Sequence, residues 1–308
     1  MHNTPQPSTR SDSSSRLDVQ FPSGNSQCSA WLYLPDAPKA PVIVMAHGLG
    51  AVRTMRLDAF AERFRQAGYA CLVFDYRHFG DSEGTPRQLL DVKKQLQDWH
   101  AAIACARRRL DVDGQKVILW GTSFSGGHVI AAGAEDGKVA AVVAQCPFTD
   151  GLASTLALGP ISGAKVSVLA ILDVLGSVFG AAPVMVATSG KPYSAALMTA
   201  PDAEPGYKGI MPSGQPIPNE VAARFGLQIL THYPGRRAAA LNCPSLFCVC
   251  DKDSVAPSGR TLKHVRKAPR GIVKTYPEGH FDIYVGQAFE RVVADQIEFL
   301  HRTVPPSA

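Results

Sequence analysis

The sequence predicts an α/β protein with a mostly parallel central sheet, helices on both faces, and one long insertion late in the sheet. Three observations predict it. The 308 residues have an ordinary globular composition, 45% apolar and 19% charged. Continuous apolar runs such as residues 40–48, typical of strands buried on both faces, alternate with segments of helical periodicity. That alternation breaks between residues 148 and 241 and then resumes.

Strands and helices are expected in a regular order before the break. Two strands around a turn come first, at residues 16–21 and 28–35. The periodicity then predicts strands at 40–48, 69–77, 116–121 and 139–147, with helices at 56–68, 88–110 and 123–135 between them. After the break it predicts strands at 244–251 and 271–279, and helices at 258–268 and 288–303. The α/β core therefore comprises residues 16–147 and 242–308.

The segment 148–241 reads as an inserted helical lid. It holds small apolar helices and then a Pro/Gly-rich stretch, residues 200–220. An insertion of this length is typical of a lid or substrate pocket. Its apolar stretch 166–187 is long enough to raise the question of a membrane span. Asp173 and two glycines interrupt that stretch, which favours a buried or lid helix over a span.

Several function classes find no support in the sequence. The net charge of +5 comes from scattered basic residues without aromatic or motif context, so no nucleic-acid partner is expected. No metal motif, phosphate loop or dinucleotide fingerprint is found, so neither a metal nor a cofactor is expected. The seven cysteines lack a C-x-x-C spacing and fit reduced core thiols. Residues 1–15 lack the apolar core of a secretion signal and are expected to be a disordered tail, which favours a cytoplasmic protein.

The stretch "LWGTSFSGG", residues 119–127, carries the chemistry. A strand ends there in Gly121, Ser123 lies at the tip of the turn, and a helix rich in small residues begins at once. This is the strand–turn–helix context of a nucleophilic serine at the carboxyl end of a sheet. Ser125 stands where the G-x-S-x-G pattern has its last glycine. The alternative is an N-capping serine in an ordinary loop.

A nucleophilic serine needs a base, and the base needs a carboxylate that orients it. His280 follows a predicted strand, and Asp253 follows the strand before it, so both lie at the sheet edge of Ser123. Asp251, nearer to its strand, is the rival acid. Of the competing histidines, His47 leads a different loop, and the rest lie on helical or lid segments: His128, His232, His264 and His301.

The backbone amides of Leu49 and Phe124 are the expected oxyanion donors. "MAHGLG" ends the first buried strand, and its glycines leave the backbone free to face the site. Phe124 is the residue after the nucleophile, the usual second donor. For the residues around Gly48, a simple strand-ending turn is an equally good interpretation.

Five blocks in order, "HGLG", "FDYRHFGDSEG", "WGTSFSGG", "CDKDSVAP" and "EGHFDIY", resemble the α/β-hydrolase superfamily. The resemblance runs from about residue 17 to the last helix. Within the superfamily, the chain is most similar to the dienelactone-hydrolase and X-Pro-peptidase-like branch, which includes fungal polyketide transferases. This resemblance implies the α/β-hydrolase fold and a serine esterase. It also implies that Asp75, Arg77, Asp81 and Ser82 brace the site by hydrogen bonds. Ser125 and Cys250 depart from the family's glycines without removing a catalytic group.

The expected reaction is hydrolysis of a carboxylic ester or thioester of an apolar acyl group through a Ser–His–Asp triad and an acyl-enzyme. Alternatives are an acyltransferase or thioesterase on a polyketide-type chain, a peptidase that would use acidic groups such as Glu204 or Glu220, and a non-catalytic binding protein on the same fold. The expected partner is a small ester, thioester or acyl molecule. No membrane span is expected, and a homodimer is left open.

Overall fold

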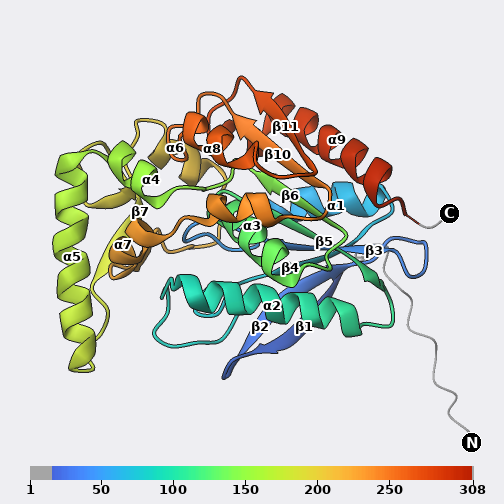
Figure 1. Ribbon diagram of the computed structural model, residues 1–308. Coiled ribbons are helices and arrows are strands. Elements are labelled where there is room, and N and C mark those ends of the chain that lie inside the picture. The colour runs from blue at the N-terminus through green and yellow to red at the C-terminus, as the bar shows by residue number, and fades with distance from the viewer. Residues whose placement is uncertain (1–15, 307–308) are drawn as a thin grey trace, which may run out of the picture.

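The computed structural model describes residues 16–306, so the predicted tail at residues 1–15 lies outside the described residues. Its centre is an eight-stranded sheet in the order β1-β2-β4-β3-β5-β6-β10-β11 (Figure 1). Its strands are β1 (Arg16–Ser23), β2 (Ser26–Tyr33), β3 (Pro41–Ala46), β4 (Ala70–Phe74), β5 (Asp113–Thr122), β6 (Ala141–Gln145), β10 (Ser245–Cys250) and β11 (Gly271–Tyr276).

The sheet is parallel from β4 to β11, and the hairpin β1–β2 is added antiparallel at one edge. The chain moves from β3 to β4 on one side and then returns to β5 on the other. Strand order reverses at β3, and ligands of open α/β sheets bind beside such a reversal, at the carboxyl ends of the strands.

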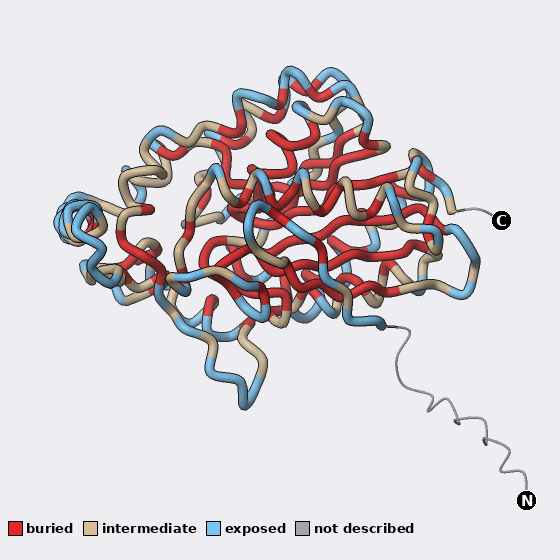
Figure 2. Tube along the Cα trace, turned by 90° about the horizontal axis from the view of Figure 1, so that it is seen from below, coloured by how far each residue is buried: buried red, intermediate tan, exposed pale blue. Residues whose placement is uncertain are grey.

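Helices cover both faces, as the sequence predicts. On one face α1 contacts α9, and on the other α2 contacts α3 (Figure 1). These helices are α1 (Leu57–Gln66), α2 (Val92–Arg108), α3 (Phe124–Asp136), α8 (Ser258–Val265) and α9 (Gly286–Thr303). The strands β3, β4, β6 and β10 are buried along their whole lengths, which explains their unbroken apolar runs, whereas the edge strands β1 and β11 are partly exposed (Figure 2).

Residues 148–241, called the insertion below, form a layer of their own beside the carboxyl ends of the strands. It contains α4 (Gly151–Leu158), α5 (Pro160–Val178), β7 (Met185–Ser189), β8 (Ala196–Met198), α6 (Ala203–Gly209), β9 (Glu220–Ala222), α7 (Phe225–Gln228), and the 3₁₀ turns η1 (Ile229–Thr231) and η2 (Pro234–Ala240). A third short turn, η3 (Asp282–Tyr284), belongs to the core.

The insertion departs from the sequence expectation in its secondary structure. It is not wholly helical, because β8, β7 and β9 form a second sheet. These strands have only three to five residues, too few to show an alternating pattern. The apolar helix α5 ends at Val178 and lies at the outer edge of the molecule (Figure 1). Within residues 16–306, it is the one helix long and apolar enough to cross a membrane, and 22% of its apolar window is buried.

Candidate active site

Ser123 occupies a strained turn between β5 and α3. Its φ of 56° and ψ of −120° lie in a region that residues other than glycine rarely adopt. The Ser123 N–H donates to the Gln145 carbonyl at 2.9 Å, and its carbonyl accepts from the Phe148 N–H at 2.9 Å. Gly121 is required beside it, because a Cβ there would lie 2.3 Å from the Ser125 carbonyl oxygen. Backbone packing therefore holds the hydroxyl out at the sheet edge.

The structure brings Ser123, His280 and Asp253 into one hydrogen-bonded row. Asp253 Oδ2 lies 2.7 Å from His280 Nδ1, and His280 Nε2 lies 2.9 Å from Ser123 Oγ. With Nδ1 donating to the carboxylate, Nε2 is left to accept the serine proton. The histidine side chain is 1% exposed and that of Asp253 2%, so the row is shielded from water.

The sequence favours Asp253 over its rival Asp251 because its loop position can reach across to His280, and the structure shows that the two side chains lie differently. Asp253 Oδ1 accepts from the Val255 and Ala256 N–H groups at 2.9 and 2.6 Å, and its other oxygen faces His280. Asp251 is exposed, and its N–H continues the pairing of β10 with β11 by donating to the Tyr276 carbonyl. The loop after β10 therefore turns Asp253 toward the histidine.

Electrostatics favour a charged His280. Burial by itself would lower the pKa of its imidazole, but the Asp253 carboxylate outweighs burial and raises that pKa above its ordinary value. The same carboxylate stabilises the imidazolium that forms when the histidine takes a proton from serine.

Leu49 and Phe124 both border the space in front of Ser123. Within residues 16–306, neither of their backbone N–H groups has a protein acceptor. Gly48 lies close beside the serine, since a Cβ at that position would be 2.9 Å from Ser123 Cβ. Leu49 in the loop after β3 and Phe124 at the start of α3 thus both border this space with backbone N–H groups that are not used within the described residues.

The loop after β4 braces the loop after β3. Asp75 Oδ1 accepts from the Arg53 N–H at 2.7 Å, and the Arg53 guanidinium also donates to Asp81 at 2.7 Å. Ser82 Oγ donates to the Asp75 carbonyl at 2.7 Å. Arg77 instead pairs with Asp98 of α2 at 2.6 Å. Asp75 and Asp81 thus hold the loop that carries Leu49 through Arg53, whereas Arg77 ties the loop after β4 to α2.

Ser125 points away from the reaction. It is fully buried as the second residue of α3, and its Oγ lies 2.7 Å from the Tyr76 hydroxyl. Trp99 Nε1 donates to the same hydroxyl at 2.8 Å. A helical φ suits serine as well as glycine. Serine in place of the last glycine of the G-x-S-x-G pattern therefore adds a buried hydrogen bond between α3 and the loop after β4.

The other histidines near the site are held by packing. His47 is buried with its ring edge-on to Tyr76, and burial lowers its pKa to about 4. His128 lies in α3 behind the turn that carries Ser123, and its Nε2 is 2.9 Å from Gln95 Oε1. His232 stacks on Phe148 of the insertion. Within the described residues, no cluster of three His, Cys, Asp or Glu side chains is arranged to hold a metal ion.

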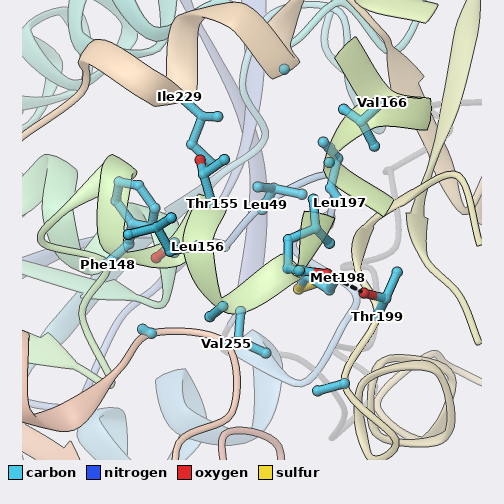
Figure 3. Close-up of a pocket in the computed structure, with 18 of the residues that line it drawn as sticks. Leu49, Phe148, Thr155, Leu156, Val166, Leu197, Met198, Thr199, Ile229 and Val255 are labelled. Atoms are coloured by element: carbon cyan, nitrogen blue, oxygen red, sulfur yellow. Dashed lines mark hydrogen bonds between the residues drawn. The ribbon is translucent and has the colours of Figure 1, made fainter. Parts of the chain in front are cut away.

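A cavity of about 350 Å³ opens from Ser123 into the insertion. Its walls come from α4, α5, β8, α7 and the loop after β10, and their side chains surround a shared space (Figure 3). The labelled lining residues are mostly apolar: Leu49, Phe148, Thr155, Leu156, Val166, Leu197, Met198, Thr199, Ile229 and Val255. Sequence reasoning located the insertion but not these residues, because no motif marks them.

A second, much smaller pocket of about 20 Å³ lies on the other side of Ser123. It is bordered by Met55, Tyr207, Ile210 and Phe281. The space beside Ser123 is therefore ample toward the insertion and small toward Met55, Tyr207, Ile210 and Phe281.

Comparisons with known proteins relate this chain to a family, to curated proteins and to solved structures. The family described as "Serine aminopeptidase, S33" matches residues 37–285. The quorum-quenching protein AidA of Acinetobacter baumannii (strain MDR-ZJ06) is 59% identical over 290 residues, covering 94% of this chain and 95% of that protein. The thiohydrolase aneE of Aspergillus aculeatus is 28% identical over 87% of each chain. The crystal structure of the α/β hydrolase GrgF from Penicillium shares the fold, with a TM-score of 0.79 at 23% identity, covering 94% of this chain and 98% of that one.

Proposed function

This chain belongs to the serine aminopeptidase S33 family of α/β hydrolases, enzymes that act on ester-type bonds, and from that premise we propose that it cleaves carboxylic esters or thioesters of apolar acyl groups. Ser123 is the nucleophile, His280 the general base and acid, and Asp253 the residue that orients the base. The observation that carries the proposal is the hydrogen-bonded row from Asp253 through His280 to Ser123, which opens into an apolar cavity.

The proposed reaction has two halves. His280 Nε2 takes the Ser123 proton as Oγ attacks the substrate carbonyl, and the N–H groups of Leu49 and Phe124 stabilise the oxyanion. The tetrahedral intermediate expels the alcohol or thiol, which receives its proton from His280. Water then gives a proton to the same nitrogen and attacks the acyl-enzyme. As the bond between the acyl carbon and Ser123 Oγ breaks, His280 returns that proton to Oγ, which restores the serine hydroxyl and releases the carboxylic acid.

We assign the acyl group to the large cavity and the bond being cleaved to its mouth, so that the insertion acts as a substrate-binding cap. An apolar wall recognises an acyl chain through the area it removes from water. The relative at 59% identity is named for quorum quenching, which favours a small signalling molecule with such a bond as the physiological substrate.

Peptidase activity fits the site less well. A peptidase that reads a free amine needs acidic groups near the cleaved bond, and no charged side chain borders the large cavity within residues 16–306. Glu204 pairs with Lys208 on the surface, and Glu220 is exposed. Asp202 at the rim accepts from Ser254.

A labelling experiment tests the nucleophile. The protein and a Ser123→Ala variant are incubated with a fluorophosphonate probe, beside Ser177→Ala, a serine of α5 that does not border the cavity. We expect labelling of the natural protein and of Ser177→Ala, and none of Ser123→Ala. Labelling that survives in Ser123→Ala would show that another residue is the nucleophile.

A second experiment separates ester from thioester cleavage. p-Nitrophenyl esters and matched thioesters with the same acyl chains are compared by kcat/KM, with and without an added alcohol acceptor. Thioester cleavage is the second candidate, since one relative is named a thiohydrolase. A transfer product that exceeds the free acid would identify an acyltransferase instead.

A further inference from the structure

Helix α5 presents large apolar side chains to solvent along its whole length. We call this surface the outer face. Each of its members is at least 50% exposed: Ile161, Val168, Ile171, Leu172, Leu175, Val178 and the capping residue Phe179. Figure 2 views the helix end-on at the edge of the molecule, where most of its turns are exposed. An ordinary surface helix carries polar residues on this side.

The inner face of α5 fixes its orientation. Ser162, Val166 and Ala170 are buried against the rest of the insertion. Asp173, also buried, accepts from the Arg224 Nε and Nη2 atoms at 2.7 and 2.8 Å and from the Val184 N–H at 2.9 Å. Rotating the helix to bury the outer face would move Asp173 away from Arg224 and the Val184 N–H and break these hydrogen bonds. The exposed apolar side is therefore part of the folded structure.

The spacing on the outer face is that of a helix-pairing seam. Ile161, Val168 and Leu175 recur every seven residues. Ala164 and the pair 171–172 fall between them, and the pair 178–179 follows Leu175. Apolar residues at this average spacing of 3.5 favour packing against a second helix.

The size and charge of the outer face suit a second copy of the chain. The exposed fractions of its seven side chains correspond to roughly 700 Å², close to the roughly 800 Å² that each partner buries in a standard interface. The only exposed charged residue of α5 is Lys165, whose ammonium donates to the Tyr193 carbonyl. A face without like charges can meet itself across a two-fold axis. It also lacks the basic residues that attract an anionic membrane.

We propose that the outer face of α5 is the self-association surface of this protein, on which the same face of a second copy packs in a two-fold symmetric dimer. The cavity beneath α5 lies on the opposite side of the helix, where Gly163, Val166 and Ser167 border it. The dimer thus leaves that wall in place and covers the apolar side.

Sedimentation velocity of the full chain tests this proposal. Three proteins are compared: the natural chain, the double variant Val168→Glu/Leu172→Glu, and the control Leu110→Glu. Leu110 is 90% exposed and follows α2, far from α5 in the sequence. Its replacement by glutamate therefore tests the effect of exchanging an exposed leucine for a charge outside the outer face. At about 1 to 100 μM we expect a dimer for the natural chain and for the control, and a dissociation constant at least about a hundredfold larger for the double variant.

Charge reversal adds an internal check. A second double variant, Val168→Lys/Leu172→Lys, is expected to be monomeric alone and to form a mixed dimer with the glutamate variant. Circular dichroism and thermal unfolding verify folding, and Val168→Ser/Leu172→Ser replaces a variant that misfolds. A dimer that persists in every variant would place the contact elsewhere and overturn the proposal. A natural chain that stays monomeric, whether or not it floats with phosphatidylglycerol–phosphatidylethanolamine vesicles, would overturn it as well.

Discussion

The carboxyl edge of the sheet and the insertion that covers it are stabilised differently. At the edge, Ser123, Asp253 and His280 each make at least two hydrogen bonds, several of them to backbone groups of neighbouring loops. The cavity wall across from them consists of apolar side chains from α4, α5 and β8. Polar directional contacts fix a geometry closely, whereas apolar packing tolerates exchange of side chains of similar volume. If the proposed function holds, we therefore expect changes at the edge to alter the reaction rate and changes in the insertion to alter the choice of substrate.

The largest expected effect separates two neighbouring carboxylates of the edge. Asp253→Asn removes the charge that orients and stabilises protonated His280, so kcat should fall by about 10³- to 10⁴-fold. Asp251→Asn is the matched control and should change kcat by less than about threefold, because its side chain is exposed. Ester hydrolysis by purified variants measures both. Equal losses in the two variants would remove Asp253 from its assigned role.

A change in the insertion should alter substrate choice and leave the chemistry intact. Gly163 borders the cavity, and a Cβ added there meets no atom within 4 Å. Gly163→Leu should therefore fill part of the cavity and lower kcat/KM for long acyl esters by about 10- to 100-fold.

Acetyl esters serve as the internal reference for Gly163→Leu and should react at the natural rate, while Gly163→Ala should show a small loss on long chains. Equal losses on short and long esters would mean that the acyl chain does not occupy this cavity.

The pH dependence tests the electrostatics of the edge. His280 acts as a base only when neutral, so kcat/KM should rise about tenfold per pH unit below its pKa and level off above it. Because Asp253 raises that pKa, the midpoint should lie above the ordinary value near 6.5. In Asp253→Asn the residual activity should show a lower midpoint. A natural midpoint at or below the ordinary value contradicts the charge pairing described here.

The smallest expected effect concerns Ser125. Ser125→Ala removes the hydroxyl that meets Tyr76 and should lower the free energy of unfolding by about 1–2 kcal/mol, with activity within about twofold. Ser125→Gly should cost slightly more, because glycine is a poorer helix former. Urea unfolding followed by fluorescence measures both. A large loss of kcat without loss of stability would give this hydroxyl a role in the reaction.

Much of the core could be predicted because its signals are local. A continuous apolar run predicts a strand buried on both faces, and β3 is such a strand. The α/β-hydrolase fold predicted from five ordered blocks is confirmed by the family match and by the shared fold of solved structures. The second sheet of the insertion was missed because its strands are too short for a period to appear.

The sequence by itself determined the order of strands and helices, the strand–turn–helix that presents Ser123, and the placement of His280 and Asp253 at the same edge. These follow from the periodicity of apolar residues and from the fact that the carboxyl ends of parallel strands lie at the same edge of the sheet. Only the tertiary structure decided how Asp253 contacts His280, that the cavity lies under α4 and α5, and that α5 turns its large apolar residues outward. Each of these depends on contacts between segments distant in the chain, which no local pattern encodes.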